Sequence, residues 1–134
     1  MATRSVIAKL DDKGVQAIYC HNDGYLSNNG KILDQHYANE VKVDNLIAQG
    51  DASSLKDTIE DTIFYMRDRG EENKEATNLN NETKLLEFAF EECDAELVYM
   101  FAYGSWYVYD NSDKIGDSSY QFIELEEALY NVLA

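Results

Sequence analysis

The chain has 134 residues and carries 26 Asp and Glu against 11 Lys and Arg, a formal net charge of −15 at pH 7. A field of that size and sign repels nucleic acid and anionic membranes, which argues against direct binding to either. Hydrophobic residues make up 45% of the chain and aromatic residues 12%, which indicates a folded protein. The length fits one domain over residues 1–134.

Secretion and membrane signals are missing from the sequence. No apolar run approaches the ~18–20 residues of a membrane span, and no basic and then apolar segment opens the chain. The two cysteines, Cys20 and Cys93, do not make a disulfide framework, and we interpret both as reduced thiols in or near the core. We therefore expect a soluble, cytosolic protein.

Two segments separated by a turn predict an N-terminal β-hairpin. Residues 5–10 and 15–20 have strand character, and the Asp-Asp-Lys-Gly sequence at 11–14 is a turn signal. Residues 21–30 are rich in Asn, Asp, Ser and Gly, which predicts a loop. From Lys31 the spacing of the apolar residues becomes helical.

The middle of the chain alternates ordered and polar segments. Asn39 is placed to cap a second helix, and Gly50 is placed to end it. Residues 62–66 predict a third strand. The polar stretch 67–81 has no apolar periodicity, so we interpret it as a mobile surface loop.

The last part of the chain predicts two helices and a strong hairpin. Apolar spacing predicts helices over 82–93 and 122–132, and dense β-branched and aromatic residues predict a hairpin over 96–110. Asn81 or Asn80 is placed to cap the first of these helices. Residues 111–119 are polar, which predicts another loop. The predicted fold is α+β: a mostly antiparallel sheet of the N-terminal hairpin, a middle strand and the Tyr- and Trp-rich hairpin, packed with three to four helices.

The negative charge is concentrated after residue 50. Residues 1–50 carry five basic and six acidic residues, whereas residues 51–134 carry six basic and twenty acidic ones. We therefore expect an acidic, partner-binding face in the second part, although a merely solubilising surface is the more common explanation of such charge. The residues proposed for this face are Glu71, Glu72, Glu75, Glu87, Glu91, Glu92, Asp94, Glu96, Glu124, Glu126 and Glu127.

Such a face could imitate the phosphates of DNA. A helix over 82–96 is about 22 Å long, and B-DNA of that length carries roughly 13 phosphates. The six carboxylates of this span supply under half of that number. Acidic residues at 71–75, and at 124–127 on a neighbouring helix, could bring the count close. The protein would then fit the basic cleft of a DNA-binding protein.

A second candidate site follows the N-terminal hairpin. His21, Asp23, Tyr25 and His36 could bind a metal ion or a small ligand, because two histidines and a carboxylate are a common ligand set. Known metal-binding spacings are missing, however, and turn hydrogen bonds explain the same residues. Cys20 and His21 are adjacent on a strand and point to opposite faces, so they do not form a catalytic dyad. We assign no catalytic residue, metal or cofactor.

The aromatic residues of the 96–110 hairpin could stack nucleic-acid bases. Such a platform needs basic residues to hold the phosphates, and Lys114 is the only one after residue 100. We therefore interpret these aromatic residues as sheet core and cross-strand pairs. The exposed tyrosines among them remain available for a homodimer interface.

Residues 18–25 read IYCHNDGY, followed by Gly30 and by LDQHY at 33–37. This pattern resembles a group of small proteins encoded by phages, prophages and plasmids, in which a hairpin precedes a motif like IYCHxDGY, a glycine and L-x-x-H-Y. Residues 42–51 and 67–71 fit the same pattern, as does the late Tyr- and Trp-rich hairpin. The group often has an aromatic residue where this chain has Asn, and a proline where it has Leu26.

The resemblance implies an accessory protein of a mobile element that works in the cytoplasm of a bacterial host, and it carries over no catalytic activity. In that setting small acidic proteins often antagonise host defence, and several anti-restriction and anti-CRISPR proteins imitate DNA. We expect a non-enzymatic protein that binds and inhibits a basic or DNA-binding host protein. The alternative is a small enzyme, or a metal- or ligand-binding protein, centred on His21 and His36.

Overall fold

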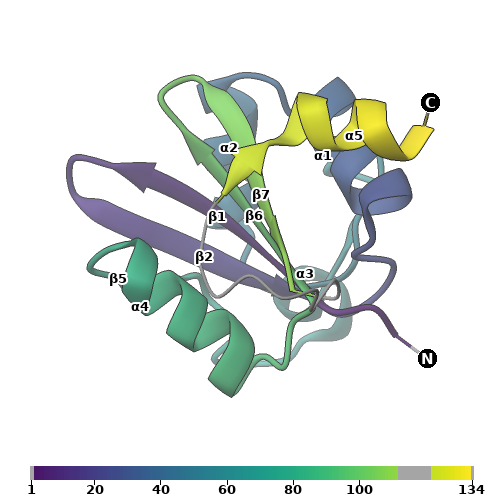
Figure 1. Ribbon diagram of the computed structural model, residues 1–134. Helices are drawn as coiled ribbons and strands as arrows, with labels where there is room; N and C mark the ends of the chain where they lie inside the picture. The colour runs from purple at the N-terminus through teal and green to yellow at the C-terminus, as the bar shows by residue number, and fades with distance from the viewer. Residues whose placement is uncertain (1, 112–121, 134) are drawn as a thin grey trace.

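The computed structural model describes residues 2–111 and 122–133 (Figure 1). Its strands form one sheet in the order β4-β3-β2-β1-β6-β7-β8, and β5 pairs with β2 beside this path. The elements are β1 (Ser5–Asp11), β2 (Gly14–Cys20), η1 (Leu26–Gly30), α1 (Lys31–His36), α2 (Glu40–Ala48), β3 (Ala52–Ser54), β4 (Ile63–Phe64), α3 (Tyr65–Arg69), β5 (Thr77–Leu79), α4 (Glu82–Glu87), η2 (Phe88–Glu92), β6 (Leu97–Ala102), β7 (Ser105–Asp110), β8 (Ile123–Glu124) and α5 (Leu125–Leu133).

The predicted α+β class is confirmed, but the expectation of a mostly antiparallel sheet is wrong. β1 pairs in parallel with β6, with Ser5 opposite Leu97, and β2 pairs in parallel with β3, with Cys20 opposite Ala52. A parallel pair needs a long crossover between its strands, and α1 and α2 supply it between β2 and β3. The sheet is therefore mixed.

The region predicted as a strand over 62–66 and a loop over 67–81 contains α3 and β5. The carboxylate of Asp68 accepts the backbone N–H of Phe64 at 2.8 Å, so β4 stops after two residues and the chain turns into α3. Gly70 ends α3 in the left-handed conformation, with φ +65°. The described residues therefore hold five α-helices, where three to four were expected.

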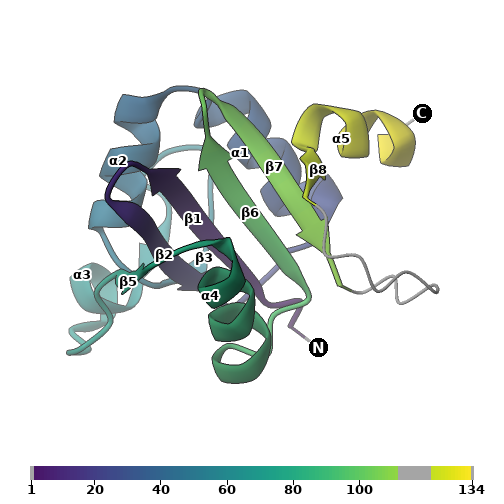
Figure 2. The same ribbon diagram turned by 60° about the vertical axis from the view of Figure 1, so that its left-hand side comes forward.

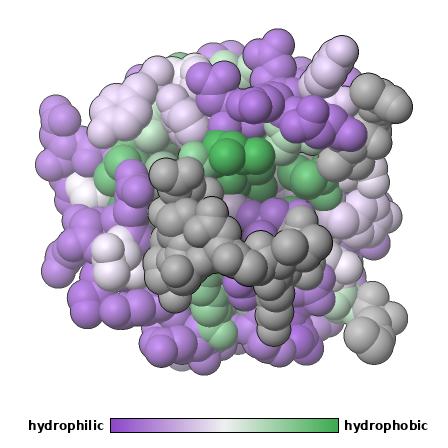
Figure 3. Space-filling model, in the orientation of Figure 1, coloured by the Kyte–Doolittle hydropathy of each residue, from purple (hydrophilic) through white to green (hydrophobic). Residues whose placement is uncertain are grey.

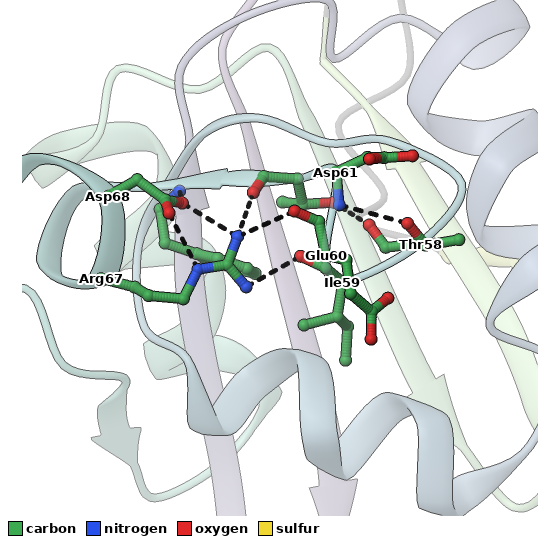
Figure 4. Close-up of polar contacts among 8 residues, drawn as sticks. Thr58, Ile59, Glu60, Asp61, Arg67 and Asp68 are labelled. Atoms are coloured by element: carbon green, nitrogen blue, oxygen red, sulfur yellow. Dashed lines mark hydrogen bonds and ion pairs between the residues drawn. The ribbon is translucent and has the colours of Figure 1, made fainter.

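The side chain of Arg67 ties the turn before β4 to α3 (Figure 4). Its guanidinium donates to the carbonyl oxygens of Ile59, Glu60 and Thr62 at 2.7–3.2 Å and pairs with the carboxylate of Asp68. The hydrogen bond between the side chains of Arg67 and Asp68 raises the pKa of Arg67 and lowers the pKa of Asp68. One charged side chain thus orders a turn that lacks regular secondary structure.

Two hydrophobic clusters lie on opposite faces of the sheet. α1, α2 and α5 bury Leu33, Leu46 and Leu125 against one face, and α4 with η2 buries Leu85 and Ala89 against the other. Figure 2 shows α4 in front of the sheet, with α1 and α2 behind it. The side chains that α4 and α5 turn away from the sheet therefore point to opposite sides of the molecule.

Local predictions at the hairpins and helix ends are confirmed. β1 and β2 form the N-terminal hairpin, and β6 and β7 form the later one. Asn39 caps α2 by accepting the backbone N–H of Lys42 at 2.9 Å, and Gly50 follows the helix with φ +83°. Asn81 caps α4 in the same way, through the N–H of Lys84 at 3.0 Å.

The last helix starts later than predicted. The sequence placed Phe122 on the apolar stripe of that helix, but its ring packs 6.0 Å from the ring of Tyr109 on the α4 face. The short strand β8 separates it from α5, which begins at Leu125. The predicted loop over 111–119 lies outside the described residues from position 112 onward, as does the side chain of Val132.

Candidate functional site

The loop after β2 is joined to β3 by backbone and side-chain hydrogen bonds. The N–H of His21 donates to the carbonyl of Ala52 at 3.1 Å, and that of Asn22 donates to the carbonyl of Ser53 at 2.9 Å. The amide group of Asn22 also donates to the hydroxyls of Ser53 and Ser54, at 3.3 and 3.2 Å. These contacts extend the pairing of two strands whose ladder is only one residue pair long.

Gly24 and Asn29 lock the same loop against the sheet. The carbonyl of Gly24 accepts the hydroxyl of Tyr99 at 2.6 Å, and a Cβ at Gly24 would lie 2.7 Å from the Cβ of Ser5. The fully buried amide of Asn29 donates to the Ser5 hydroxyl and to the Cys20 sulfur. The contacts of the IYCHNDGY motif therefore hold β1, β2, β6 and η1 together.

The two histidines of the second candidate site lie on different faces of the sheet. Tyr19 alternates with the buried Cys20, so Tyr19 and His21 point to the α4 face, where Nδ1 of His21 is 2.6 Å from the hydroxyl of Tyr19. His36 belongs to α1 on the other face, and its Nε2 is 3.6 Å from a carboxylate oxygen of Asp57. The structure does not bring His21 and His36 together.

Asp23 and Tyr25 shape the loop through their backbones. Asp23 has φ +56°, and its carbonyl accepts the side-chain amide of Asn28 and the backbone N–H of Asn29. Tyr25 accepts the N–H of Asn28 through its carbonyl, and its side chain is exposed. Across residues 2–111 and 122–133, no group of three His, Cys, Asp or Glu side chains is placed to hold a metal ion.

Both thiols are held in the protonated form. Cys20 is fully buried, and burial raises its pKa; its sulfur donates to the carbonyl of Asn22. Burial and the nearby carboxylate of Asp51 raise the pKa of Cys93 to about 12. A reactive cysteine needs a lowered pKa, so neither thiol is placed to act as a nucleophile.

The proposed acidic residues divide into three groups. Glu71, Glu72 and Glu75 lie in the link between α3 and β5, and Glu87 to Glu96 lie on α4, on η2 and in the turn before β6. Glu124, Glu126 and Glu127 belong to β8 and α5, across the sheet from α4. The prediction that the last group lies on a helix next to α4 is therefore wrong. All eleven residues are exposed.

We define the α4–η2 surface as Glu87, Glu91, Glu92, Asp94 and Glu96, the largest of the three groups. Lys84 pairs with the first of them at 3.2 Å, and Arg4 pairs with Asp94 at 3.0 Å. The other three carboxylates have no ion-pair partner within the described part of the chain. Arginine and lysine residues of a partner could therefore pair with them.

An apolar hollow of about 340 Å³ adjoins the carboxylates of the α4–η2 surface. Leu86 and Phe90, both half-buried, line it together with Thr83, Glu87 and Glu91. Figure 3 shows one face of the molecule, on which hydrophilic residues surround several smaller hydrophobic patches. Apolar atoms rimmed by carboxylates suit a partner whose basic side chains have long apolar stems.

The tyrosine-rich hairpin is mostly part of the core, as predicted. Tyr99 is fully buried, Tyr107 and Tyr109 are half-buried, and Trp106 is 6% exposed. Tyr103 at the tip of the hairpin is 89% exposed. The homodimer interface that was predicted for exposed tyrosines would therefore depend on this one side chain of the hairpin.

No protein-family model matches the chain, and no curated protein or solved structure matched it either. None of the described helices is long and apolar enough to cross a bilayer. The structure itself describes an α+β protein with a mixed sheet and with acidic surfaces on both of its helical layers.

Proposed function

We propose that this protein is a non-enzymatic inhibitor that binds a basic surface of another protein through the α4–η2 surface. Its provenance, taken from the resemblance of its N-terminal half, would be a phage or related mobile element, and its place of action the cytoplasm of the bacterial host. The partner would be a host defence protein or a nucleic-acid-processing protein. Occupying the basic surface of such a partner would block its access to nucleic acid.

One observation carries this proposal: a helical layer whose inner side packs on the sheet turns several unpaired carboxylates outward. Leu85 and Ala89 hold the inner side, while Glu91, Glu92 and Glu96 are exposed. Ion pairs at a protein interface speed association and select partners of opposite charge. The surface therefore favours a basic partner and disfavours nucleic acid itself.

DNA mimicry is the narrower form of this proposal. Residues 82–92 form eleven residues of helix, about 16 Å at the rise of an α-helix, and B-DNA of that length carries roughly 10 phosphates. The span supplies four carboxylates, and the acidic residues of α5 lie across the sheet. A basic protein surface is therefore better supported as the target than a complete DNA-binding cleft. Competition by a short DNA duplex for the bound partner tests the narrower form.

Charge reversal on the α4–η2 surface tests the proposal. The immobilised variant Glu87→Lys, Glu91→Lys, Glu92→Lys is compared with wild-type protein for capture of basic proteins from a bacterial host lysate, at low and high salt. Asp57→Lys, Glu60→Lys, Asp61→Lys is the matched control, because it changes the net charge equally on an exposed turn.

The proposal predicts that wild-type protein and the control variant capture the same basic protein at low salt, and that high salt releases it. The α4–η2 variant should fail to capture it while unfolding at the same temperature as the wild type. Equal capture by all three proteins, or capture that is independent of salt, contradicts the proposal.

A further inference from the structure

A groove on the other face of the molecule combines aromatic and acidic side chains. A hollow of about 180 Å³ is lined by Asp34 of α1, Trp106 of β7, Glu124 of β8 and Glu126 of α5. A larger hollow of about 540 Å³ shares the lining residues Ala38, Phe101 and Gly104 with it. We call the two together the Trp106 groove.

The aromatic floor of the groove is closely packed and hydrogen-bonded. The indole N–H of Trp106 donates to the carbonyl of Tyr37 at 2.8 Å, and the ring of Phe101 meets the indole edge-on at 5.3 Å. Both aromatic side chains are more than nine-tenths buried. A ligand would therefore meet a fixed surface and would not have to order it, which reduces the entropic cost of binding.

Two of the carboxylates around this floor, those of Asp34 and Glu126, repel each other. Partial burial and the charge of Glu126 both raise the pKa of Asp34, because each disfavours its ionised form. In the described residues, none of Asp34, Glu124 and Glu126 has a basic ion-pair partner. A cation placed between them would relieve this repulsion.

The rim of the larger hollow carries further charge of the same sign. Asp11, Asp12 and Glu40 line it, and the one basic residue there, Lys9, already binds Glu40 at 2.9 Å and Asp44 at 2.6 Å. Burial opposes the charge of Lys9, but these two carboxylates outweigh it and raise its pKa. The rim therefore offers a partner unneutralised negative charge.

We propose that the Trp106 groove binds an arginine- or lysine-containing segment of a partner protein, with one basic side chain in the smaller hollow. Charge complementarity identifies this occupant: three carboxylates without a basic partner among the described residues line the smaller hollow beside Trp106, and carboxylates bind cationic side chains favourably. The neighbouring residues of the segment would lie in the larger hollow, next to the exposed Tyr103. This inference rests on the proposed function for the class of partner, but it uses different residues.

The test uses acetylated, amidated tetraarginine as the probe, with acetylated, amidated tetraglutamine as the uncharged control. Trp106 is the only tryptophan of the chain, so its fluorescence and its indole N–H resonance report binding in this groove. Tetraarginine should change both signals saturably, and tetraglutamine should change neither. Unchanged signals at saturating tetraarginine would overturn the inference.

Two triple variants with the same net charge locate the binding site. Asp34→Asn, Glu124→Gln, Glu126→Gln should weaken tetraarginine binding about tenfold, the effect of three weak ion pairs. Glu87→Gln, Glu91→Gln, Glu92→Gln, across the sheet from the groove, should weaken it by at most about twofold, because salt screens remote charges. Equal weakening by both variants would show non-specific attraction and overturn the inference.

Two further measurements keep these outcomes separate. If Asp34→Asn impairs folding, the double variant Glu124→Gln, Glu126→Gln replaces the triple, because both of these side chains are exposed. The α4–η2 variant should bind tetraarginine in the groove as the wild type does, whatever its effect on the captured partner. Loss of partner capture by that variant alone therefore tests the proposed function, and the indole signal tests the groove.

Discussion

At the scale of single residues, the IYCHNDGY motif holds neighbouring strands of the sheet together. His21 and Asn22 extend the pairing of β2 with β3 through their backbones, and the carbonyl of Gly24 accepts a hydrogen bond from the buried Tyr99. Asn29 satisfies its amide in the same region. Packing and hydrogen bonding thus explain Cys20, Asn22 and Gly24 of the motif without a ligand.

Replacing Gly24 with alanine should destabilise this region. The new Cβ would lie 2.7 Å from the Cβ of Ser5 and 2.8 Å from the carbonyl oxygen of Thr3, both closer than such atoms pack. We expect Gly24→Ala to lower the free energy of unfolding in urea by about 1–3 kcal/mol. Ser5→Gly removes one obstacle, so Gly24→Ala should cost less in a chain that already carries Ser5→Gly than in the wild type. An unchanged urea midpoint would contradict the clash.

Asp51 makes the stability depend on pH. Burial raises the pKa of its carboxyl group above the usual 3.8, although it accepts the backbone N–H of Tyr19 at 2.9 Å. Between 3.8 and the raised value the folded state holds a proton that the unfolded state has lost, so this group's contribution to stability falls as the pH rises.

The variant Asp51→Asn removes this titration and keeps an oxygen that can accept the Tyr19 N–H. Relative to wild type, its free energy of unfolding should therefore increase from about pH 4 to about pH 7. Urea unfolding across that range measures the difference. A difference that stays constant with pH would show that Asp51 does not titrate as described.

At the scale of elements, α4 depends on its N-cap. The side-chain oxygen of Asn81 accepts the N–H of Lys84, one of the backbone donors that the first turn leaves unpaired. We expect Asn81→Ala to cost about 1 kcal/mol of unfolding free energy and Asn81→Ser to cost much less. Thermal unfolding compares the two variants, and equal losses would contradict a capping role.

The sequence predicted those elements whose signals are local. Asn39 and Asn81 precede helical spacing, and the two hairpins have their turn residues between strands. It did not predict β5 in a polar segment, because three strand residues beside β2 have no periodicity of their own. Nor did it predict α3, which depends on the bond between Asp68 and the N–H of Phe64.

At the scale of the whole molecule, topology decides which charges act together. The parallel pairing of β1 with β6 joins segments about ninety residues apart, and no local pattern reports such a pair. The placement of α4 and α5 on opposite faces follows from the same topology. The exposed carboxylates were therefore predictable one by one, but their division between two surfaces was not, and Asp34 was missed as a neighbour of Glu126.

The net charge of −15 should make these surfaces attract basic proteins. The distance over which this attraction acts becomes shorter as the salt concentration rises. Both acidic regions lie on helical layers outside the sheet, and the α4–η2 surface has the larger number of carboxylates, five against the three of β8 and α5. The central claim is that this surface, and not the net charge alone, holds the partner.

The most direct test is the affinity of the captured partner for purified wild-type protein and for the two charge-reversed triple variants, measured by calorimetry at several salt concentrations. We expect at least about a tenfold loss for Glu87→Lys, Glu91→Lys, Glu92→Lys, and a change within about twofold for Asp57→Lys, Glu60→Lys, Asp61→Lys. Wild-type affinity should fall as salt rises. Equal losses for the two variants would contradict the central claim.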